Sequence, residues 1–268
     1  MIPNILAIAG SDPSGGAGIQ ADLKSISANG GYAMAAITAL TAQNTKGVAG
    51  VSLVETPFIS AQIKAVFDDI RVDAVKIGMM GTVAITEAVV AALQGHQGWV
   101  VVDPVMVAKG GDRLLAADAV SALREKLLPV ASLITPNLPE AADLLGTDEA
   151  RNLAEMEQQA RALIAHGAKA VLLKGGHLRS EVCSDLLLTR DGIKQWFAAP
   201  RTYTRNTHGT GCTLSSALAT QLALTGDILK ACAAAKNYIN SAIAAADHLT
   251  VGHGHGPVDH FFNLRSKV

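Results

Sequence analysis

The chain has 268 residues, which suits one large α/β unit, and we expect a single domain over residues 1–268. Hydrophobic residues make up 49% and charged residues 17%, a balance that provides a substantial core and excludes intrinsic disorder. The formal net charge of −1 disfavours a general nucleic-acid binder, whose surface would carry a basic excess.

Cysteine usage and apolar runs indicate a compartment. The three cysteines form no CxxC pair, which disfavours a disulfide framework or a zinc ribbon and fits a reducing environment. No secretory signal is visible, and the longest uncharged stretch, 25–45, is interrupted by polar residues and glycines. We therefore predict a cytoplasmic protein without a membrane span.

Short apolar runs alternate with longer amphipathic runs along the chain. The predicted strands are 5–9, 33–40, 73–77, 99–103, 132–135 and 170–174, followed by a hairpin of 185–189 and 194–198. The predicted helices are 18–29, 57–70, 82–93, 114–127, 138–145, 152–166, 211–224 and 228–247. This alternation predicts a three-layer α/β/α fold whose central sheet is largely parallel. Ligands of such sheets bind beyond the carboxyl ends of the strands.

The glycine-rich segment 10–18 follows the first predicted strand and enters a helix. It lacks the lysine of a phosphate-binding P-loop. Residues 16–21 match GxGxxA, but no acidic residue occurs from Leu23 to Val54 to hold a ribose, which disfavours a dinucleotide-dependent oxidoreductase. Two interpretations stay open: a flexible loop beside a small ligand, with Gly10 at its start, and a purely structural turn.

A second glycine segment, Gly209-Thr210-Gly211-Cys212, immediately precedes a long predicted helix. Glycine backbones can turn several N–H groups toward one point, and the positive helix end adds to their attraction for an anion. The segment therefore predicts an anion hole. The alternative is an ordinary glycine-rich helix start with a packed cysteine.

Polar residues follow three further predicted strands. Asp103 ends one strand, Asn137 and Glu140 follow the next, and Lys174 ends a third. Carboxylate and amide oxygens suit Mg²⁺ held partly through water and phosphate, and a lysine at a strand end can neutralise triphosphate charge. Taken singly, Glu140 also fits a first-turn carboxylate favoured by the helix dipole, and Lys174 fits a solvated surface residue.

Together these segments resemble the ribokinase-like superfamily, and within it the hydroxymethylpyrimidine/phosphomethylpyrimidine kinases of thiamine biosynthesis. The matching segments are AGSDPSGGAGIQADLK, TALTAQNT, KIGMMG, DPVM, TPNLPEA, KGGH, GTGCTLSSA and GHGHGP. They run nearly from end to end, and their combination is specific although each one alone is weak. The resemblance implies a largely parallel sheet between helical layers, ATP as phosphoryl donor, Mg²⁺ and a homodimer.

The resemblance also implies roles for the matching residues. Gly209, Thr210, Gly211 and Cys212 correspond to the anion hole and the catalytic position, where many sugar kinases of the superfamily have aspartate. Asn137 and Glu140 resemble an NxxE motif that organises Mg²⁺ and phosphate, and Asp103 resembles the acidic residue near the metal and the triphosphate.

Asp22, Gln43 and Met80 match positions that contact the pyrimidine in the family. Gln43 has both a donor and an acceptor for an aminopyrimidine edge, Asp22 can accept from an exocyclic amine, and Met80 provides a polarizable face. Without the resemblance, the same residues fit a first-turn acid, a strand-end amide and a core methionine.

We therefore expect a kinase that phosphorylates the hydroxymethylpyrimidine precursor of thiamine to its monophosphate and then to its diphosphate. The alternatives are a pyridoxal or pyridoxine kinase of the same superfamily and a nucleotide-binding regulator without activity. The combined presence of Asp103, Asn137, Glu140 and Cys212 disfavours the regulator.

Overall fold

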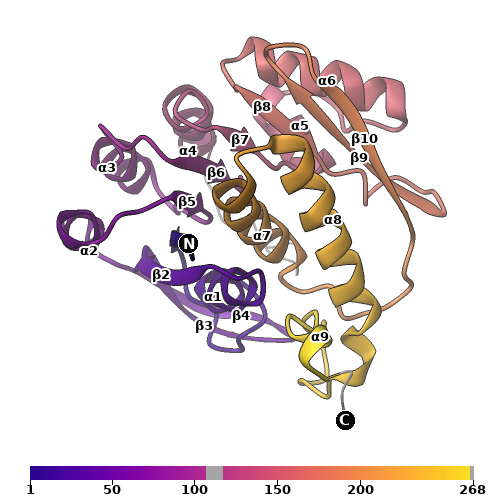
Figure 1. The fold of residues 1–268 in the computed structure, drawn as a ribbon, viewed down its shortest axis with the longest axis horizontal. Coiled ribbons are helices and arrows are strands. Elements are labelled where there is room, and N and C mark those ends of the chain that lie inside the picture. The colour runs from indigo at the N-terminus through magenta and orange to yellow at the C-terminus, as the bar shows by residue number, and fades with distance from the viewer. Residues whose placement is uncertain (107–116, 266–268) are drawn as a thin grey trace.

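The computed structural model describes residues 1–106 and 117–265 and shows a central sheet between two layers of helices (Figure 1). The eight strands of this sheet are β1 Asn4–Ala9, β2 Tyr32–Ile37, β5 Ala74–Ile77, β6 Trp99–Val102, β7 Leu133–Ile134, β8 Ala170–Leu173, β9 Val182–Thr189 and β10 Lys194–Pro200. The predicted α/β/α architecture is confirmed.

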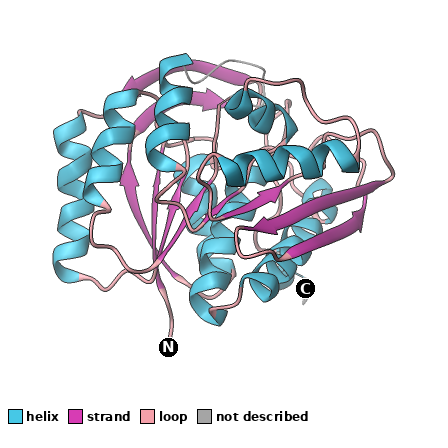
Figure 2. Ribbon diagram, turned by 90° about the horizontal axis from the view of Figure 1, so that it is seen from above, coloured by secondary structure: helices cyan, strands magenta, loops and turns pink. Residues whose placement is uncertain are grey.

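The helices up to α6 lie between strands in the chain, those from α7 onward follow the last strand, and together they cover both faces of the sheet (Figure 2). They are α1 Gly18–Ala28, α2 Thr56–Asp69, α3 Val83–Ala92, α4 Ala117–Ala122 with the π-helical turn η1 Leu123–Leu127, α5 Leu138–Leu145, α6 Leu153–Ala165, α7 Thr210–Thr225, α8 Ile228–Ala244, the short 3-10 helix η2 Ala246–His248 and α9 Phe262–Arg265.

The sheet order is β10-β9-β8-β7-β6-β5-β1-β2, and its neighbours from β8 to β2 pair in parallel. The predicted hairpin forms β9 and β10, which add to the β8 edge in antiparallel register. Parallel pairing places the carboxyl ends of β1, β5, β6, β7 and β8 along one edge of the sheet, where the predicted polar residues follow them.

Side-chain alternation along the strands divides the core into two. In β1, Ile5 and Ala7 face a cluster with α1, α7 and α8, whereas Leu6 and Ile8 face a cluster with α2, α3, α5 and α6. All four side chains are 0% exposed. A parallel strand that is covered on both faces must be apolar at every position, which explains the uninterrupted apolar run of the sequence.

The predicted strand 33–40 is divided between two sheets. β2 ends at Ile37, and Thr38 then donates its N–H to Ala9 O at 3.0 Å and its hydroxyl to Met79 O at 2.8 Å. The chain continues as β3 Ala39–Asn44, which pairs with β4 Gly47–Leu53 in a separate two-stranded antiparallel sheet. The stretch 33–40 is apolar except for Thr38, and a single threonine fits a strand, so the sequence alone did not reveal the change of sheet.

The predicted helix 114–127 lies partly outside the described residues. Its described part is α4, whose last turn widens into the π-helical turn η1. Within residues 1–106 and 117–265, every helix is too short or too polar to cross a bilayer.

Candidate active site

A cavity of about 1490 Å³ opens beyond the carboxyl ends of the parallel strands. Ten of the predicted site residues line it: Gly10, Gln43, Asp103, Asn137, Glu140, Lys174, Gly209, Thr210, Gly211 and Cys212. They come from loops after β1, β6, β7 and β8, from β3 and from the start of α7. Asp22 and Met80 are not among the residues that line the cavity.

The start of α7 combines a left-handed glycine with uncapped amides. Gly209 has φ +76°, and a Cβ at this position would lie 1.8 Å from the Gly16 carbonyl oxygen. Among the described residues, no side chain caps the α7 N-terminus. The Thr210 N–H makes a long 3.4 Å bond to Thr207 O, and the N–H groups of Gly211 and Cys212 that follow are orphan donors of a helix start, available to a ligand. Because the two glycine loops pack backbone to backbone, the loop after β1 supports the predicted anion hole.

Cys212 follows Gly211 in the first turn of α7 and lines the cavity. Burial raises the pKa of its thiol to about 11, and the charge of Lys76 opposes this rise, while Asp22 and Asp103 add to it. The side chain is therefore a neutral thiol near neutral pH. It carries a proton, and it can act as a base only if that proton first passes to another acceptor.

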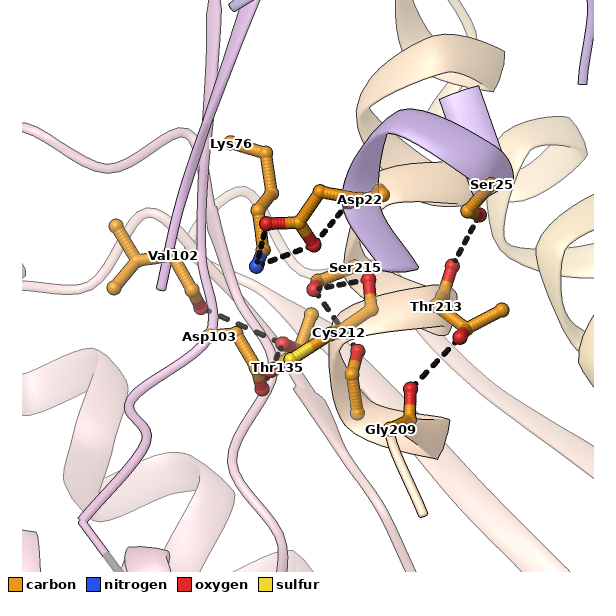
Figure 3. Close-up of polar contacts among 12 residues, drawn as sticks. Asp22, Ser25, Lys76, Val102, Asp103, Thr135, Gly209, Cys212, Thr213 and Ser215 are labelled. Atoms are coloured by element: carbon orange, nitrogen blue, oxygen red, sulfur yellow. Dashed lines mark hydrogen bonds and ion pairs between the residues drawn. The ribbon is translucent and has the colours of Figure 1, made fainter. Parts of the chain in front are cut away.

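Asp22 lies beneath the thiol instead of on the cavity wall (Figure 3). Its carboxylate is 0% exposed and accepts two hydrogen bonds from Lys76 Nζ, at 2.7 and 2.9 Å, and one from Ser216 Oγ at 2.8 Å. Both oxygens are already bonded, so the geometry does not support the prediction that Asp22 accepts from a substrate amine. The sequence signal for its partner was a lysine inside the apolar strand β5.

The methionine that reaches the cavity is Met79. Met80 is 2% exposed and packs in the core cluster between the sheet and α2 and α3. Met79 lines the cavity, and its Cε is 2.6 Å from the position that a Cβ on Gly10 would take. The predicted ring contact of Met80 therefore gains no support, whereas Gly10 leaves room for the neighbouring methionine.

Gln43 lies on β3 directly after a β-bulge, where the register shifts between Ala42 and Gln43. Its amide nitrogen is 3.4 Å from His208 Nε2, and His208 Nε2 is 2.8 Å from Asp12 Oδ2. Asp12 and His208 are buried, at 2% and 8% exposure. Sequence analysis assigned them no role, although Asp12 lies within the first glycine segment and His208 directly precedes the second.

The acidic and basic residues that follow β6, β7 and β8 come together near Cys212. Lys174 Nζ donates to Asp103 Oδ1 at 3.1 Å and lies 3.9 Å from Glu140 Oε2. Burial raises the pKa of Glu140 to about 7, against the opposing charge of Lys174. Burial lowers the pKa of Lys174, but Asp103 and Glu140 outweigh it and hold this pKa above its usual value.

Asn137 and Glu140 form a reciprocal helix cap. Asn137 is the N-cap of α5 and accepts from Glu140 N–H at 2.8 Å, while Glu140 accepts from Asn137 N–H at 2.7 Å. The predicted cap carboxylate and the predicted ligand are thus the same side chain. The same oxygen, Glu140 Oε2, accepts from the Asn137 N–H and lies 3.9 Å from Lys174 Nζ, so the cap fixes the carboxyl beside the lysine.

A further ion pair that sequence analysis missed lies in the cavity wall. Lys236 on α8 donates to Asp185 Oδ2 at 2.6 Å, and Asp185 Oδ1 accepts from Gly175 N–H at 2.9 Å. The lysine falls within an alanine-rich helix, where its sequence neighbours gave no sign of a partner on β9.

The family profile described as phosphomethylpyrimidine kinase matches residues 12–259. The hydroxymethylpyrimidine/phosphomethylpyrimidine kinase of Escherichia coli strain K12 is 55% identical over 259 residues, which cover 96% of this chain and 97% of that protein. Among solved structures, the pyridoxal kinase of Bacillus subtilis in an ADP complex aligns with a TM-score of 0.91 and 37% identity, covering 99% of this chain and 100% of that one. A phosphomethylpyrimidine kinase from Clostridium difficile 630 aligns with a TM-score of 0.79 and 43% identity, covering 91% and 100%. The chain therefore belongs to the phosphomethylpyrimidine kinase family and is a phosphotransferase of ribokinase-like fold.

Proposed function

We propose that this kinase uses ATP to phosphorylate 4-amino-5-hydroxymethyl-2-methylpyrimidine to its monophosphate and then to its diphosphate, as a step of thiamine biosynthesis. The observation that carries the proposal is the placement of Cys212 and the uncapped α7 amides in one cavity with Asp103, Glu140 and Lys174. Gln43 on the wall of that cavity adds a donor and an acceptor for an aminopyrimidine edge.

Phosphoryl transfer depends mainly on positioning and on stabilisation of charge. The N–H groups of the first turn of α7 take up negative charge that develops on the transferred group, and Lys174 offsets the charge of the donor phosphates. Cys212 enters as a neutral thiol, so it can accept the proton of the substrate hydroxyl only if its own S–H proton passes to another acceptor, such as an oxygen of the transferred phosphoryl group.

The carboxylates beside Lys174 fit a magnesium ion. In the described parts of the chain, no group of three or more acidic, histidine or cysteine side chains forms a closed metal cage. Asp103 and Glu140 contribute two hard oxygen donors, which suits an ion that keeps several waters and binds through substrate phosphates. Mg²⁺ held there would neutralise charge on the donor phosphates.

The two proposed transfers make different demands on Cys212. The first acceptor is a neutral hydroxyl that must lose a proton, whereas the second acceptor is a phosphate oxygen that is already largely anionic. Replacement of Cys212 by alanine should therefore slow the first transfer by about 10²- to 10⁴-fold, the usual contribution of general acid–base catalysis, and slow the second much less.

The experiment supplies ATP, Mg²⁺ and the hydroxymethylpyrimidine, or its monophosphate, and resolves the two products by chromatography. Cys212→Ala is compared with Cys212→Asp, which should retain part of the first activity because aspartate can accept the proton. Equal losses in both transfers would instead assign Cys212 to phosphate stabilisation. No turnover of the pyrimidine by the unaltered enzyme would reject the proposed substrate.

Pyridoxal is a second candidate substrate, because pyridoxal kinases are among the similar solved structures. Pyridoxal is also a hydroxymethyl heteroaromatic, so it meets the same anion hole and the same thiol. Comparison of kcat/KM for pyridoxal and for the pyrimidine separates the two, and we expect the pyrimidine to be preferred.

Three broader properties complete the proposal: one kinase domain over residues 1–268, a cytoplasmic location and a homodimer. Support for the dimer comes from the separate β3–β4 sheet, where Leu40, Val51 and Leu53 are 53%, 50% and 47% exposed. Light scattering on the purified chain tests the dimer.

A further inference from the structure

One ring nitrogen of His208, Nε2, has two polar neighbours. His208 Nε2 lies 2.8 Å from Asp12 Oδ2 and 3.4 Å from the Gln43 amide nitrogen. His208 directly precedes the anion hole, Asp12 belongs to the loop after β1, and Gln43 belongs to β3. The three side chains therefore connect the two glycine segments with the cavity wall.

Asp12 accepts hydrogen bonds at both of its carboxylate oxygens. Its Oδ1 accepts from Ser14 N–H at 2.9 Å and from the Ser14 hydroxyl at 2.7 Å, and its Oδ2 accepts from Ala17 N–H at 2.8 Å. Burial raises the pKa of Asp12, but the hydrogen bonds from His208 and Ser14 hold it below its usual value overall. An ionised carboxylate only accepts hydrogen bonds, so His208 Nε2 must carry a proton and donate it.

Thr41 is the other neighbour of the Gln43 amide. Its hydroxyl donates its one proton to Ser11 O at 2.8 Å. The Gln43 amide oxygen lies 3.3 Å from Thr41 Oγ1, which has no second proton to donate, so two acceptors face each other in this orientation. The Thr41 oxygen therefore requires an N–H group from the amide at that position.

Both neighbours thus call for the same amide orientation. The single N–H of His208 Nε2 already bonds Asp12 Oδ2, so a Gln43 N–H group beside it sets donor against donor, whereas the Gln43 oxygen does not. The Thr41 oxygen requires a donor, which is the Gln43 nitrogen. A half-turn of the amide exchanges these two atoms without changing the shape of the side chain, so the hydrogen-bond network decides between the orientations.

We propose that the Asp12–His208 pair is a positioning device that holds the Gln43 amide with its oxygen toward His208 and its nitrogen toward Thr41, and so sets the donor–acceptor order that the cavity offers to a ring. This inference rests on the proposed function and deepens it. A 4-aminopyrimidine edge presents an amine donor directly beside a ring-nitrogen acceptor. An amide that is fixed in one orientation matches one order of these two groups and opposes the other.

Loss of the device should weaken substrate binding and leave the chemistry intact. A released amide populates both orientations, and the wrong one sets donor against donor at the ring. We expect the KM for the pyrimidine to rise about 10-fold, the effect of roughly one neutral hydrogen bond, while kcat and the KM for ATP stay within about 2-fold.

The kinetic test is a double-mutant cycle between His208→Phe, which keeps a ring but removes the proton, and Gln43→Ala. If His208 acts through Gln43, His208→Phe adds no further loss once Gln43 is alanine. Independent, additive losses would assign His208 a packing role and overturn the proposal. His166→Phe, at the exposed C-cap of α6, is the matched histidine control and should leave every constant unchanged.

A second pair of variants approaches the amide from its other side and leaves Asp12 paired. Thr41→Val removes the acceptor for the Gln43 nitrogen, whereas Thr41→Ser keeps it. We expect Thr41→Val to raise the KM for the pyrimidine several-fold and Thr41→Ser to behave as the unaltered enzyme. An unchanged KM in Thr41→Val would contradict the proposed orientation.

Nitrogen-15 NMR of histidine-labelled protein measures which ring nitrogen of His208 carries the proton, and it needs no substrate. His208→Phe assigns the signal, and Nε2 should carry a proton in the unaltered chain. Asp12→Asn, which can turn its amide nitrogen toward His208, should move that proton to Nδ1. An unprotonated Nε2 in the unaltered chain overturns the inference, whereas failure to phosphorylate the pyrimidine with a protonated Nε2 rejects only the proposed substrate.

Discussion

Two lysine–carboxylate groups lie on either side of Cys212, and they differ in stoichiometry and in access to the cavity. Lys76 and Asp22 are both 0% exposed, and each charge has one partner of opposite sign. Lys174 is 15% exposed and lies between two carboxylates, Asp103 at 3.1 Å and Glu140 at 3.9 Å. The first group is closed and balanced, and the second is open and carries an excess negative charge.

The difference separates a structural ion pair from a group arranged for ligands. The Lys76–Asp22 pair joins β5 to α1, and Ser216 adds a bond from α7, so three elements depend on it. The Lys174 group contains one more carboxyl group than it has cations. Burial raises the pKa of Glu140, and this carboxyl group is available to bind a cation. Replacement of Lys76 should therefore lower stability, whereas replacement of Lys174 should lower activity.

The largest effect is expected from Lys76→Met. It leaves the Asp22 carboxylate buried without its cation, and we expect the free energy of unfolding to fall by about 3–5 kcal/mol in urea titrations. The double variant Asp22→Asn/Lys76→Met removes both charges and should recover much of that loss. If the double variant were as unstable as the single one, lost packing rather than an unpaired charge would be the cause.

Lys174→Met should fail in catalysis instead. Loss of a cation at the donor phosphates should lower kcat/KM by about 10²- to 10³-fold in the coupled kinase assay, because no other described lysine pairs with Asp103 or Glu140. The loss in unfolding free energy should be clearly smaller than for Lys76→Met. A variant with normal kcat/KM would show that the open group does not serve the phosphates.

Glu140→Gln should change how stability depends on pH. A buried carboxyl with a pKa of about 7 binds a proton more tightly in the folded than in the unfolded chain. Its contribution to stability is therefore present below its ordinary pKa of about 4.5 and is lost as the pH rises toward 7. We expect the unaltered chain to lose about 1–3 kcal/mol over that interval through this group, and the glutamine variant to lose less. Parallel pH profiles would place the carboxyl's pKa near its ordinary value.

The smallest effect is expected at the surface. Lys64 pairs with Asp68 four residues along α2, where the two side chains are 73% and 59% exposed. Lys64→Met should change the unfolding free energy by no more than about 0.5 kcal/mol. This matched lysine variant controls for the substitution itself, and a loss near that of Lys76→Met would remove the distinction drawn from burial.

Local sequence was sufficient wherever a residue's role follows from its position at the end of an element. Asp103, Asn137 and Lys174 directly follow apolar strands, and parallel pairing alone brings such positions to one edge. The same reasoning could not tell Met80 from Met79, because both follow β5 and only packing decides which side chain enters the core. The family resemblance, and not local position, assigned Asp22 to the substrate, and its partner Lys76 is 54 residues away in the sequence.

Outside the β3–β4 hairpin, the sequence by itself determined the alternation of strands and helices, and it also determined the two glycine segments and the residue types available for phosphoryl transfer, because hydrophobic periodicity and glycine placement are local properties. Tertiary structure alone decided which charges are satisfied internally and which face the cavity. Asp12 meets His208 across 196 residues, and Ser216 meets Asp22 across 194. Such pairings depend on how α1 and α7 pack on the sheet, and that packing is a property of the whole chain.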